Sequence, residues 1–229
     1  MRTPGEDVDL AVGFLLSEGI IFHKRDIVKA EYLPHKSNLS QENRLLIGLA
    51  GHVDFDFAKL ERHFYTSSSC GVCGKSSIEA VTCESDYDLT DNHLIVRKEV
   101  LFQLPRKLRA AQKLFDATGG IHAAGLFDKT GNLIILREDV GRHKADDKVI
   151  GAALQRDLLP ASAYIVQVGG RTSFELVQKT VAAGIPVLSA VGAPSGLAAA
   201  LAAESNMTLL GFVRENRFNI YAGEERVEK

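Results

Sequence analysis

The feature that most limits the fold of this chain is a regular alternation of helical and strand-like segments toward its C-terminal end. Aliphatic and β-branched runs predict strands, and amphipathic or alanine-rich segments predict helices, in the order helix 144–154, strand 164–168, helix 174–183, strand 185–188, helix 197–205 and strand 208–213. Such units are joined by right-handed crossovers and form a parallel sheet with helices on its faces. We therefore expect an α/β domain over residues 100–229.

The residues before this alternation predict an antiparallel addition to the sheet. Segments 122–127 and 132–136 flank the turn sequence Asp128-Lys129-Thr130-Gly131, which is typical of a β-hairpin. A helix is expected to open at Pro105, because proline fits the first helical position, and to end at Gly119-Gly120. The predicted sheet is therefore mixed.

The N-terminal part, residues 1–99, is expected to be a smaller and irregular α+β unit. Thr3-Pro4-Gly5-Glu6 has the spacing of a capping box with proline at the first helical position, and apolar residues then recur at helical spacing up to Gly19. Segments 27–33 and 45–49 predict short strands. We place the domain boundary near residue 100.

Composition excludes several classes of protein. The chain has 229 residues, of which 45% are hydrophobic and 24% charged, so it is expected to be globular and not disordered. Its net charge of -2 provides no positive field to gather nucleic acid or an anionic membrane. The longest apolar run, Leu197 to Ala203, is far shorter than the roughly 20 residues of a membrane span. The first residues, MRTPGEDVDL, lack the pattern of a secretory signal, and a cytoplasmic location is expected.

Two of the three cysteines form the motif Cys70-Gly71-Val72-Cys73, inside a serine- and glycine-rich stretch over residues 66–77. A thiolate is the reactive form of cysteine, and the following residues 76–79 offer a helix start that favours ionisation. The alternative is half of a zinc knuckle or a pair of inert thiols. A tetrahedral zinc site needs four ligands, and the only other thiol is Cys83, which is expected to be a buried apolar residue. We predict no metal site, and leave redox exchange and persulfide relay open.

Three further segments are candidate binding sites because each joins a predicted strand to a predicted helix. The run from Arg137 to Lys144 contains His143, which either binds a ligand or caps a helix. The loops 168–173 and 189–196 combine small residues and hydroxyls with Arg171, a composition suited to phosphates or polar ring edges. Neither loop fits the dinucleotide-binding or P-loop patterns. The alternative to a binding site is that both are ordinary loops between a strand and a helix.

His122 is interpreted as a structural histidine, because a zinc deaminase would need a glutamate where this chain has Ala124.

Together these segments resemble the formate dehydrogenase accessory sulfurtransferase family, often called FdhD. The resemblance rests on matching stretches that cover about two-thirds of the chain in the family's order, which are RTPGEDVDLAVGFLLSEGII, SSSCGVCGKSSIEAV, TGGIHAAGLFD, REDVGRHKADDKVIG, GGRTSFELVQKTVAAGIPVLSAVGAPSGLA and LLGFVRENRF. The chain departs from the family pattern at Lys144, Asp146, Glu215 and Asn216.

The resemblance implies a homodimeric sulfurtransferase with a cytidine-deaminase-like, three-layer α/β/α sandwich. It implies that the protein accepts persulfide sulfur from a cysteine desulfurase and passes it to the molybdenum of a bis(molybdopterin guanine dinucleotide) cofactor, before this cofactor enters formate dehydrogenase. By the same resemblance Cys70 carries the persulfide and Cys73 assists or resolves it. The family's cofactor-contacting segment falls on Phe212, Val213, Arg214, Glu215, Asn216 and Arg217. Arg171 and His143 are expected to complete this site.

Two other functions are consistent with the same residues. One is a chaperone that binds the molybdenum cofactor without moving sulfur. The other is a dithiol oxidoreductase that uses the CxxC motif, although the Ser-rich lead-in and Gly-Val spacer differ from a thioredoxin-type site.

Overall fold

The computed structural model describes residues 1–33, 44–54 and 87–228 of the chain. Its centre is a six-stranded sheet in the order β5-β4-β6-β7-β8-β9. The strands are β4 (His122–Asp128), β5 (Leu133–Asp139), β6 (Tyr164–Val168), β7 (Val187–Ala190), β8 (Thr208–Gly211) and β9 (Asn219–Ala222). β4 pairs antiparallel with both β5 and β6, β6 to β8 pair in parallel, and β9 returns antiparallel to β8. Four strands, β5 to β8, therefore point the same way, and their carboxyl ends meet at one edge of the sheet.

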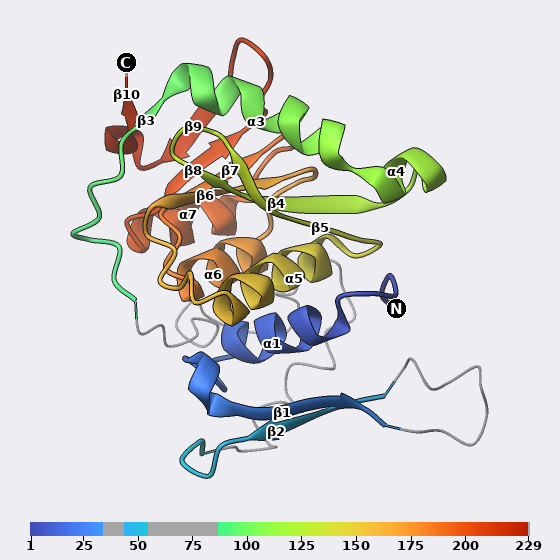
Figure 1. Cartoon of the computed structure of the whole chain (residues 1–229). Helices are drawn as coiled ribbons and strands as arrows, with labels where there is room; N and C mark the ends of the chain where they lie inside the picture. The colour runs from blue at the N-terminus through green and yellow to red at the C-terminus, as the bar shows by residue number, and fades with distance from the viewer. Residues whose placement is uncertain (34–43, 55–86, 229) are drawn as a thin grey trace.

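Helices cover both faces of this sheet (Figure 1). The three crossover helices α5 (Arg142–Gln155), α6 (Phe174–Ala182) and α7 (Gly196–Glu204) lie on one face, because right-handed connections that proceed in one direction stay on one side. They bury an apolar cluster against Leu126, Val166 and Leu188 of the strands. The other face is covered by α3 (Lys98–Ala111), which buries Leu101, Leu104 and Leu108 in a second cluster with Phe127, Ile165 and Val187. The short helix α4 (Lys113–Thr118) follows α3.

The N-terminal helix α1 (Asp7–Ser17) forms a further layer outside α5 (Figure 1). The single turn η1 (Lys24–Asp26) leads into an antiparallel hairpin of β1 (Ile27–Tyr32) and β2 (Leu45–Leu49). The C-terminal η3 (Glu224–Arg226) and β10 (Val227–Glu228) bring the end of the chain back to β3 (Val96–Arg97) in a short parallel pair. None of the described helices combines the length and the apolar composition that a membrane span requires.

The structure confirms the α/β class, the mixed sheet and the β4–β5 hairpin. The prediction that Pro105 opens a helix is wrong, because α3 already begins at Lys98 and carries Pro105 in its interior. Burial of the leucines of α3 against the sheet stabilises this helix by more than the loss of the backbone hydrogen bond at the proline destabilises it. The cytidine-deaminase likeness and the division at residue 100 stay predictions.

The predicted capping box at Thr3 is also wrong. Helix α1 begins at Asp7, and the residue before it, Glu6, has a left-handed backbone (φ 50°) and makes no side-chain cap. The Thr3 hydroxyl instead accepts a hydrogen bond from the backbone N–H of Val140 (2.9 Å). The residues that look like a local helix cap are used to attach the N-terminal segment to the end of β5.

Candidate functional site

Three loops at the carboxyl edge of the sheet are joined into one surface by backbone hydrogen bonds. The N–H of Gly192, in the loop after β7, donates a hydrogen bond to the carbonyl of Gly170, in the loop after β6 (3.0 Å). The Thr172 N–H donates to the Ala193 carbonyl (3.1 Å), and the Phe212 N–H, just after β8, donates to the Gly192 carbonyl (3.1 Å). The segments that sequence analysis selected after β6, β7 and β8 therefore lie side by side.

Glycine at position 192 is required by the packing of these loops against each other. A Cβ on Gly192 would lie 2.8 Å from the Cα of Arg171 and 2.8 Å from the Gly170 carbonyl oxygen. Close approach of the loops thus accounts for this small residue without a ligand. Within the same surface, Arg171 is exposed, and Thr172 is 2% exposed with a buried hydroxyl that has no hydrogen-bond partner in the described part of the chain.

The segment Phe212–Arg217 forms a tight turn at the same edge. The Arg214 N–H donates to the Arg217 carbonyl (2.8 Å), and Nη1 of Arg214 donates to the carbonyls of Val191 and Val213 (2.8 Å each). Arg214 thus attaches this turn to the loop after β7. Phe212 is 42% exposed with a left-handed backbone (φ 52°), whereas Val213 is fully buried. Exposed side chains complete the turn at Glu215, Asn216 and Arg217.

His143, in the first turn of α5, joins this surface through α6. Its Nε2 atom lies 2.8 Å from the Ser173 hydroxyl and 3.0 Å from a carboxylate oxygen of Glu175. The Nε of Arg142 lies 3.4 Å from the same nitrogen. His122, at the start of β4, lies next to the loop after β6, because a Cβ on Gly170 would lie 3.5 Å from its Nδ1. The antiparallel course of β4 places its first residue at the edge where β5 and β6 end.

His143 is neutral at physiological pH. Burial lowers its pKa to about 3, and the nearby cations Arg142, Lys179 and Lys144, together with His122, act in the same direction. Burial raises the pKa of Glu175, while Lys179 and Arg142 oppose that shift. The close contact between His143 and Glu175 is therefore a hydrogen bond and not an ion pair.

A buried charge network lies beneath this histidine, between α1, α5 and α6. Lys179 forms an ion pair with Asp147 (2.6 Å), and the Ser17 hydroxyl donates to the same carboxylate oxygen (3.2 Å). Burial opposes the charge on Lys179, but Asp147 raises its pKa above the ordinary value. The adjacent Asp146 is fully buried, and neither of its carboxylate oxygens has a hydrogen-bond partner in the described part of the chain. Burial, followed by the charge on Asp147, raises its pKa to about 8 against the opposing effect of Lys179.

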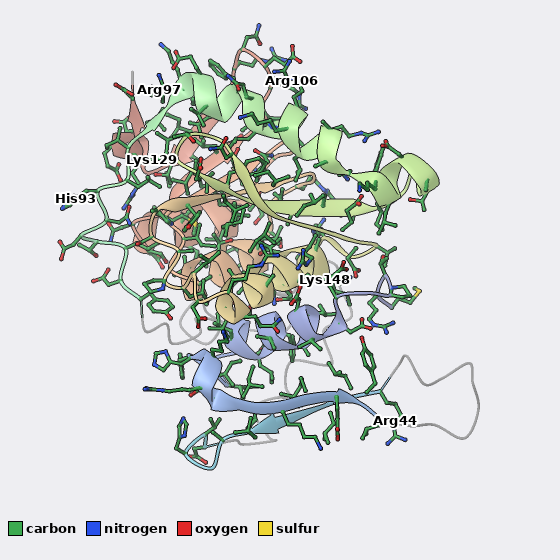
Figure 2. The ribbon with its side chains drawn as sticks, in the orientation of Figure 1. Arg44, His93, Arg97, Arg106, Lys129 and Lys148 are labelled. Atoms are coloured by element: carbon green, nitrogen blue, oxygen red, sulfur yellow. The ribbon has the colours of Figure 1, made fainter. Side chains whose placement is uncertain are left out.

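The N-terminal segment holds the end of β5 next to this site. Asp139 accepts a hydrogen bond from the Thr3 N–H (2.9 Å) and forms a fully buried ion pair with Lys148 (3.0 Å). Lys148, midway along α5 and labelled in Figure 2, also donates to the Thr3 carbonyl (3.0 Å). A second Asp139 oxygen accepts from the Gly141 N–H (2.9 Å). This network fixes the turn that leads into Arg142 and His143.

The structure thus brings His143, Arg171 and the segment Phe212–Arg217 to one edge of the sheet. Cys70, Cys73 and Cys83 lie outside the described residues. Within the described residues, no group of three or more histidine, cysteine or acidic side chains is arranged to hold a metal ion.

No local pattern in the sequence pairs Ser173 or Glu175 with His143. The only local signal was a serine directly before a predicted helix, which is also the signature of an ordinary helix cap. In the structure this serine makes no side-chain cap to α6 and contacts His143 instead.

Comparisons with known proteins agree with the resemblance seen in the sequence. The sequence model of the FdhD/NarQ family matches residues 1–228. The proteins named sulfur carrier protein FdhD of Mycolicibacterium paratuberculosis and Streptomyces coelicolor are each 49% identical to this chain, over 99% of it and over 84% and 82% of their own lengths. The protein of the same name from Saccharolobus solfataricus is 39% identical, over 99% of this chain and 82% of its own.

A solved structure supports the fold. The crystal structure of a protein from Desulfotalea psychrophila, described as a formate dehydrogenase accessory protein, superposes with a TM-score of 0.72 at 24% identity, and covers all of this chain and 82% of that one. The match of the family model over nearly the whole sequence, with relatives of up to 49% identity among those named here, shows that this chain belongs to the FdhD/NarQ family.

Proposed function

We propose that this protein is a sulfurtransferase that carries sulfur on Cys70 to a molybdenum cofactor held at the carboxyl edge of the sheet. The observation that carries the proposal is the similarity over 99% of the chain to proteins named sulfur carrier protein FdhD, in a sequence that contains Cys70-Gly71-Val72-Cys73. The sulfur donor is a cysteine desulfurase and the final recipient is formate dehydrogenase. We further propose a homodimer that acts in the cytoplasm.

The loading step is a thiolate attack on a persulfide. The Cys70 thiolate attacks the terminal sulfur of the desulfurase persulfide, the donor sulfur–sulfur bond breaks, and its electron pair leaves with the donor thiolate. The product is a Cys70 persulfide, and no net oxidation takes place. The step requires an ionised and accessible Cys70.

Delivery to the metal requires that the sulfur leave as sulfide, which needs two electrons. Attack of the Cys73 thiolate on the Sγ of Cys70 supplies them, because a Cys70–Cys73 disulfide forms while the bond from Cys70 to the carried sulfur breaks. The released sulfide replaces an oxygen ligand on the molybdenum of the bound substrate, and this oxygen takes up protons and leaves as water. A reducing dithiol then restores both thiols.

The edge of the sheet suits the dinucleotide parts of this substrate. Exposed guanidinium groups at Arg171 and Arg217 provide bidentate donors for phosphate oxygens. Phe212 offers an exposed aromatic side chain for a purine or pterin ring. The turn that holds Arg214 against the loop after β7 keeps these groups together.

Mass spectrometry of the intact protein tests sulfur loading. After incubation with a cysteine desulfurase and cysteine, we expect a gain of one sulfur that is removed by a reducing thiol. The Cys70→Ser variant is expected to gain none, whereas Cys83→Ser serves as the matched thiol control and is expected to load normally. A Cys70→Ser protein that still acquires the labile sulfur would refute the assignment.

The alternatives give different results in the same preparation. A cofactor chaperone without sulfur transfer would support formate dehydrogenase maturation after loss of both Cys70 and Cys73. A dithiol oxidoreductase would show a defined reduction potential for this pair and would form no persulfide.

A further inference from the structure

The histidine at the start of α5 has an unusual set of partners, because Ser173 and Glu175 contact the same ring nitrogen. Nε2 of His143 lies 2.8 Å from the serine hydroxyl and 3.0 Å from the carboxylate. In a Ser-His-acid catalytic triad the serine and the acid bind opposite ring nitrogens, so that the acid orients the ring while the other nitrogen takes the serine proton. A single shared nitrogen cannot serve both roles, and this geometry does not activate Ser173 as a nucleophile.

The three neighbours of Nε2 make different demands on its proton. In its ionised form the Glu175 carboxylate can only accept a hydrogen bond, whereas the Arg142 guanidinium can only donate one and the Ser173 hydroxyl can do either. The carboxylate is at 3.0 Å and the guanidinium nitrogen at 3.4 Å, beyond the usual range for N–H donors. The carboxylate is therefore the partner that decides where the proton lies.

We propose that Glu175 is a positioning residue, which fixes His143 as the neutral tautomer with a proton on Nε2 and leaves Nδ1 as a bare hydrogen-bond acceptor for the bound substrate. Nδ1 has no hydrogen-bond partner in the described part of the chain, and the His143 side chain keeps 27% of its surface exposed. The charged and titratable groups around the ring are Arg142 and Lys144 on α5, His122 on β4, and Glu175 and Lys179 on α6. The cations disfavour a second ring proton.

This assignment predicts what His143 recognises, and that part rests on the proposed function. A bare ring nitrogen attracts an N–H or O–H donor and repels a phosphate oxygen, since both would present lone pairs. His143 thus contacts a ring N–H or amino group of the guanine or pterin portion, while the phosphates are bound by the nearby arginines. The Ser173 hydroxyl accepts from Nε2–H and keeps its own proton to donate.

Nitrogen NMR of protein carrying labelled histidine tests the tautomer directly. A His143→Gln spectrum identifies the His143 signals among the seven histidines of the chain. We expect an unprotonated Nδ1 and a protonated Nε2 at both about pH 6 and about pH 8. A protonated Nδ1 in the wild-type protein overturns the proposal.

Two variants separate positioning from a merely structural role. In Glu175→Ala the partners left beside Nε2 are the Arg142 guanidinium, which can only donate, and the Ser173 hydroxyl, which can turn to donate, so the proton is expected to move toward Nδ1. In Glu175→Gln the amide oxygen still accepts, and the wild-type tautomer is expected to persist. Glu204→Ala, at the exposed end of α7, is the matched control. A Glu175→Ala spectrum identical to the wild type contradicts the proposal.

Calorimetry with guanosine diphosphate tests recognition. His143→Ala and Glu175→Ala are each expected to weaken binding roughly 2- to 10-fold, as for one neutral hydrogen bond, and Glu175→Gln by less than about twofold. If all three variants bind guanosine diphosphate as tightly as the wild-type protein, the proposed contact between His143 and the ring is wrong. If the NMR result holds but the wild-type protein does not bind guanosine diphosphate, the tautomer stands and the ligand contact fails together with the proposed nucleotide site.

Discussion

Gly13 of α1 and Gly151 of α5 face each other at a contact too close for any side chain. A Cβ on Gly151 would lie 2.7 Å from the backbone nitrogen of Gly13 and still closer to the carbonyl oxygen of Asp9. Backbone atoms surround both positions, so no side-chain movement can make room. The N-terminal helix is thus fixed against α5, whose first turn carries His143.

Substitution of Gly151 by alanine is therefore expected to destabilise the protein, although alanine favours helices. The methyl group forces α1 away from α5, and overpacking of this kind costs about 1–3 kcal/mol or more. Urea unfolding measures the loss. Gly196→Ala, in the first turn of α7 with nothing within 4 Å of the added methyl, is the control and should be neutral or slightly stabilising. Equal stability of the two variants would show that the helix contact is not close.

Lys148→Met is expected to cost about 3–5 kcal/mol, because it leaves the fully buried Asp139 without its ion-pair partner. The same substitution at Lys24, whose ion pair with Asp157 is largely exposed, should cost less than about 1 kcal/mol. Denaturant unfolding of the two variants gives the comparison. Losses of similar size would mean that the buried pair does not hold the N-terminal segment in place.

Asp146, which is buried and has no hydrogen-bond partner among the residues that the structure describes, makes stability depend on pH. Its pKa is raised to about 8 in the folded protein, chiefly by burial, from 3.8 in the unfolded chain, so the folded state retains a proton that the unfolded state loses. This contribution is fully present below about pH 4 and is lost as the pH rises toward about 8. Asp146→Val removes the buried carboxyl.

Relative to wild type, Asp146→Val should gain at least about 1–3 kcal/mol near neutral pH, and the gain should shrink as the pH falls toward about 4. Unfolding curves at two pH values measure this difference. Asp91→Asn, at an exposed turn residue, is the control and should show no such trend. If the stability gain of Asp146→Val grows as the pH falls, Asp146 does not retain its proton in the folded protein.

Loss of an exposed arginine at the carboxyl edge should weaken nucleotide binding. Arg171→Gln and Arg217→Gln are each expected to reduce the affinity for guanosine diphosphate about 10-fold or more, because each removes a charge-assisted hydrogen bond. Lys129→Gln removes an exposed cation in the turn between β4 and β5 (Figure 2), at the opposite edge of the sheet, and should leave binding unchanged. Similar losses in all three variants would indicate general electrostatic attraction and no specific site.

The periodicity of the sequence was sufficient to predict the central sheet and its crossover helices. Strands such as β6 and helices such as α6 are specified by local patterns, and their alternation leaves few arrangements. Local signals failed where tertiary contacts override them. Thr3 and Pro105 both carry signatures of a helix start. In the structure Thr3 accepts a hydrogen bond from the backbone at the end of β5, and Pro105 lies inside α3.

The candidate site was predicted only in part for the same reason. Arg171 and the segment Phe212–Arg217 follow strands, so the rule that parallel strands end at one edge brings them together. The contact of His143 with Ser173 and Glu175 joins the first turn of α5 to residues 30 and 32 positions later, at the start of α6, which no local pattern reports. Burial of Asp146 likewise follows from the packing of α5 against its neighbours, and its charge alone would have placed it at the surface.

The most direct test of the sulfurtransferase account follows radioactive sulfur from Cys70 into the molybdenum cofactor. Protein loaded by a cysteine desulfurase with labelled cysteine is mixed with the cofactor and apo-formate dehydrogenase, and the label is then measured in the isolated cofactor. We predict that the label leaves Cys70 and appears in the cofactor, that Cys70→Ser transfers none, and that the Arg171→Gln, Arg217→Gln double variant loads normally but delivers little. Equal labelling of the cofactor with the Cys70→Ser protein would contradict the account.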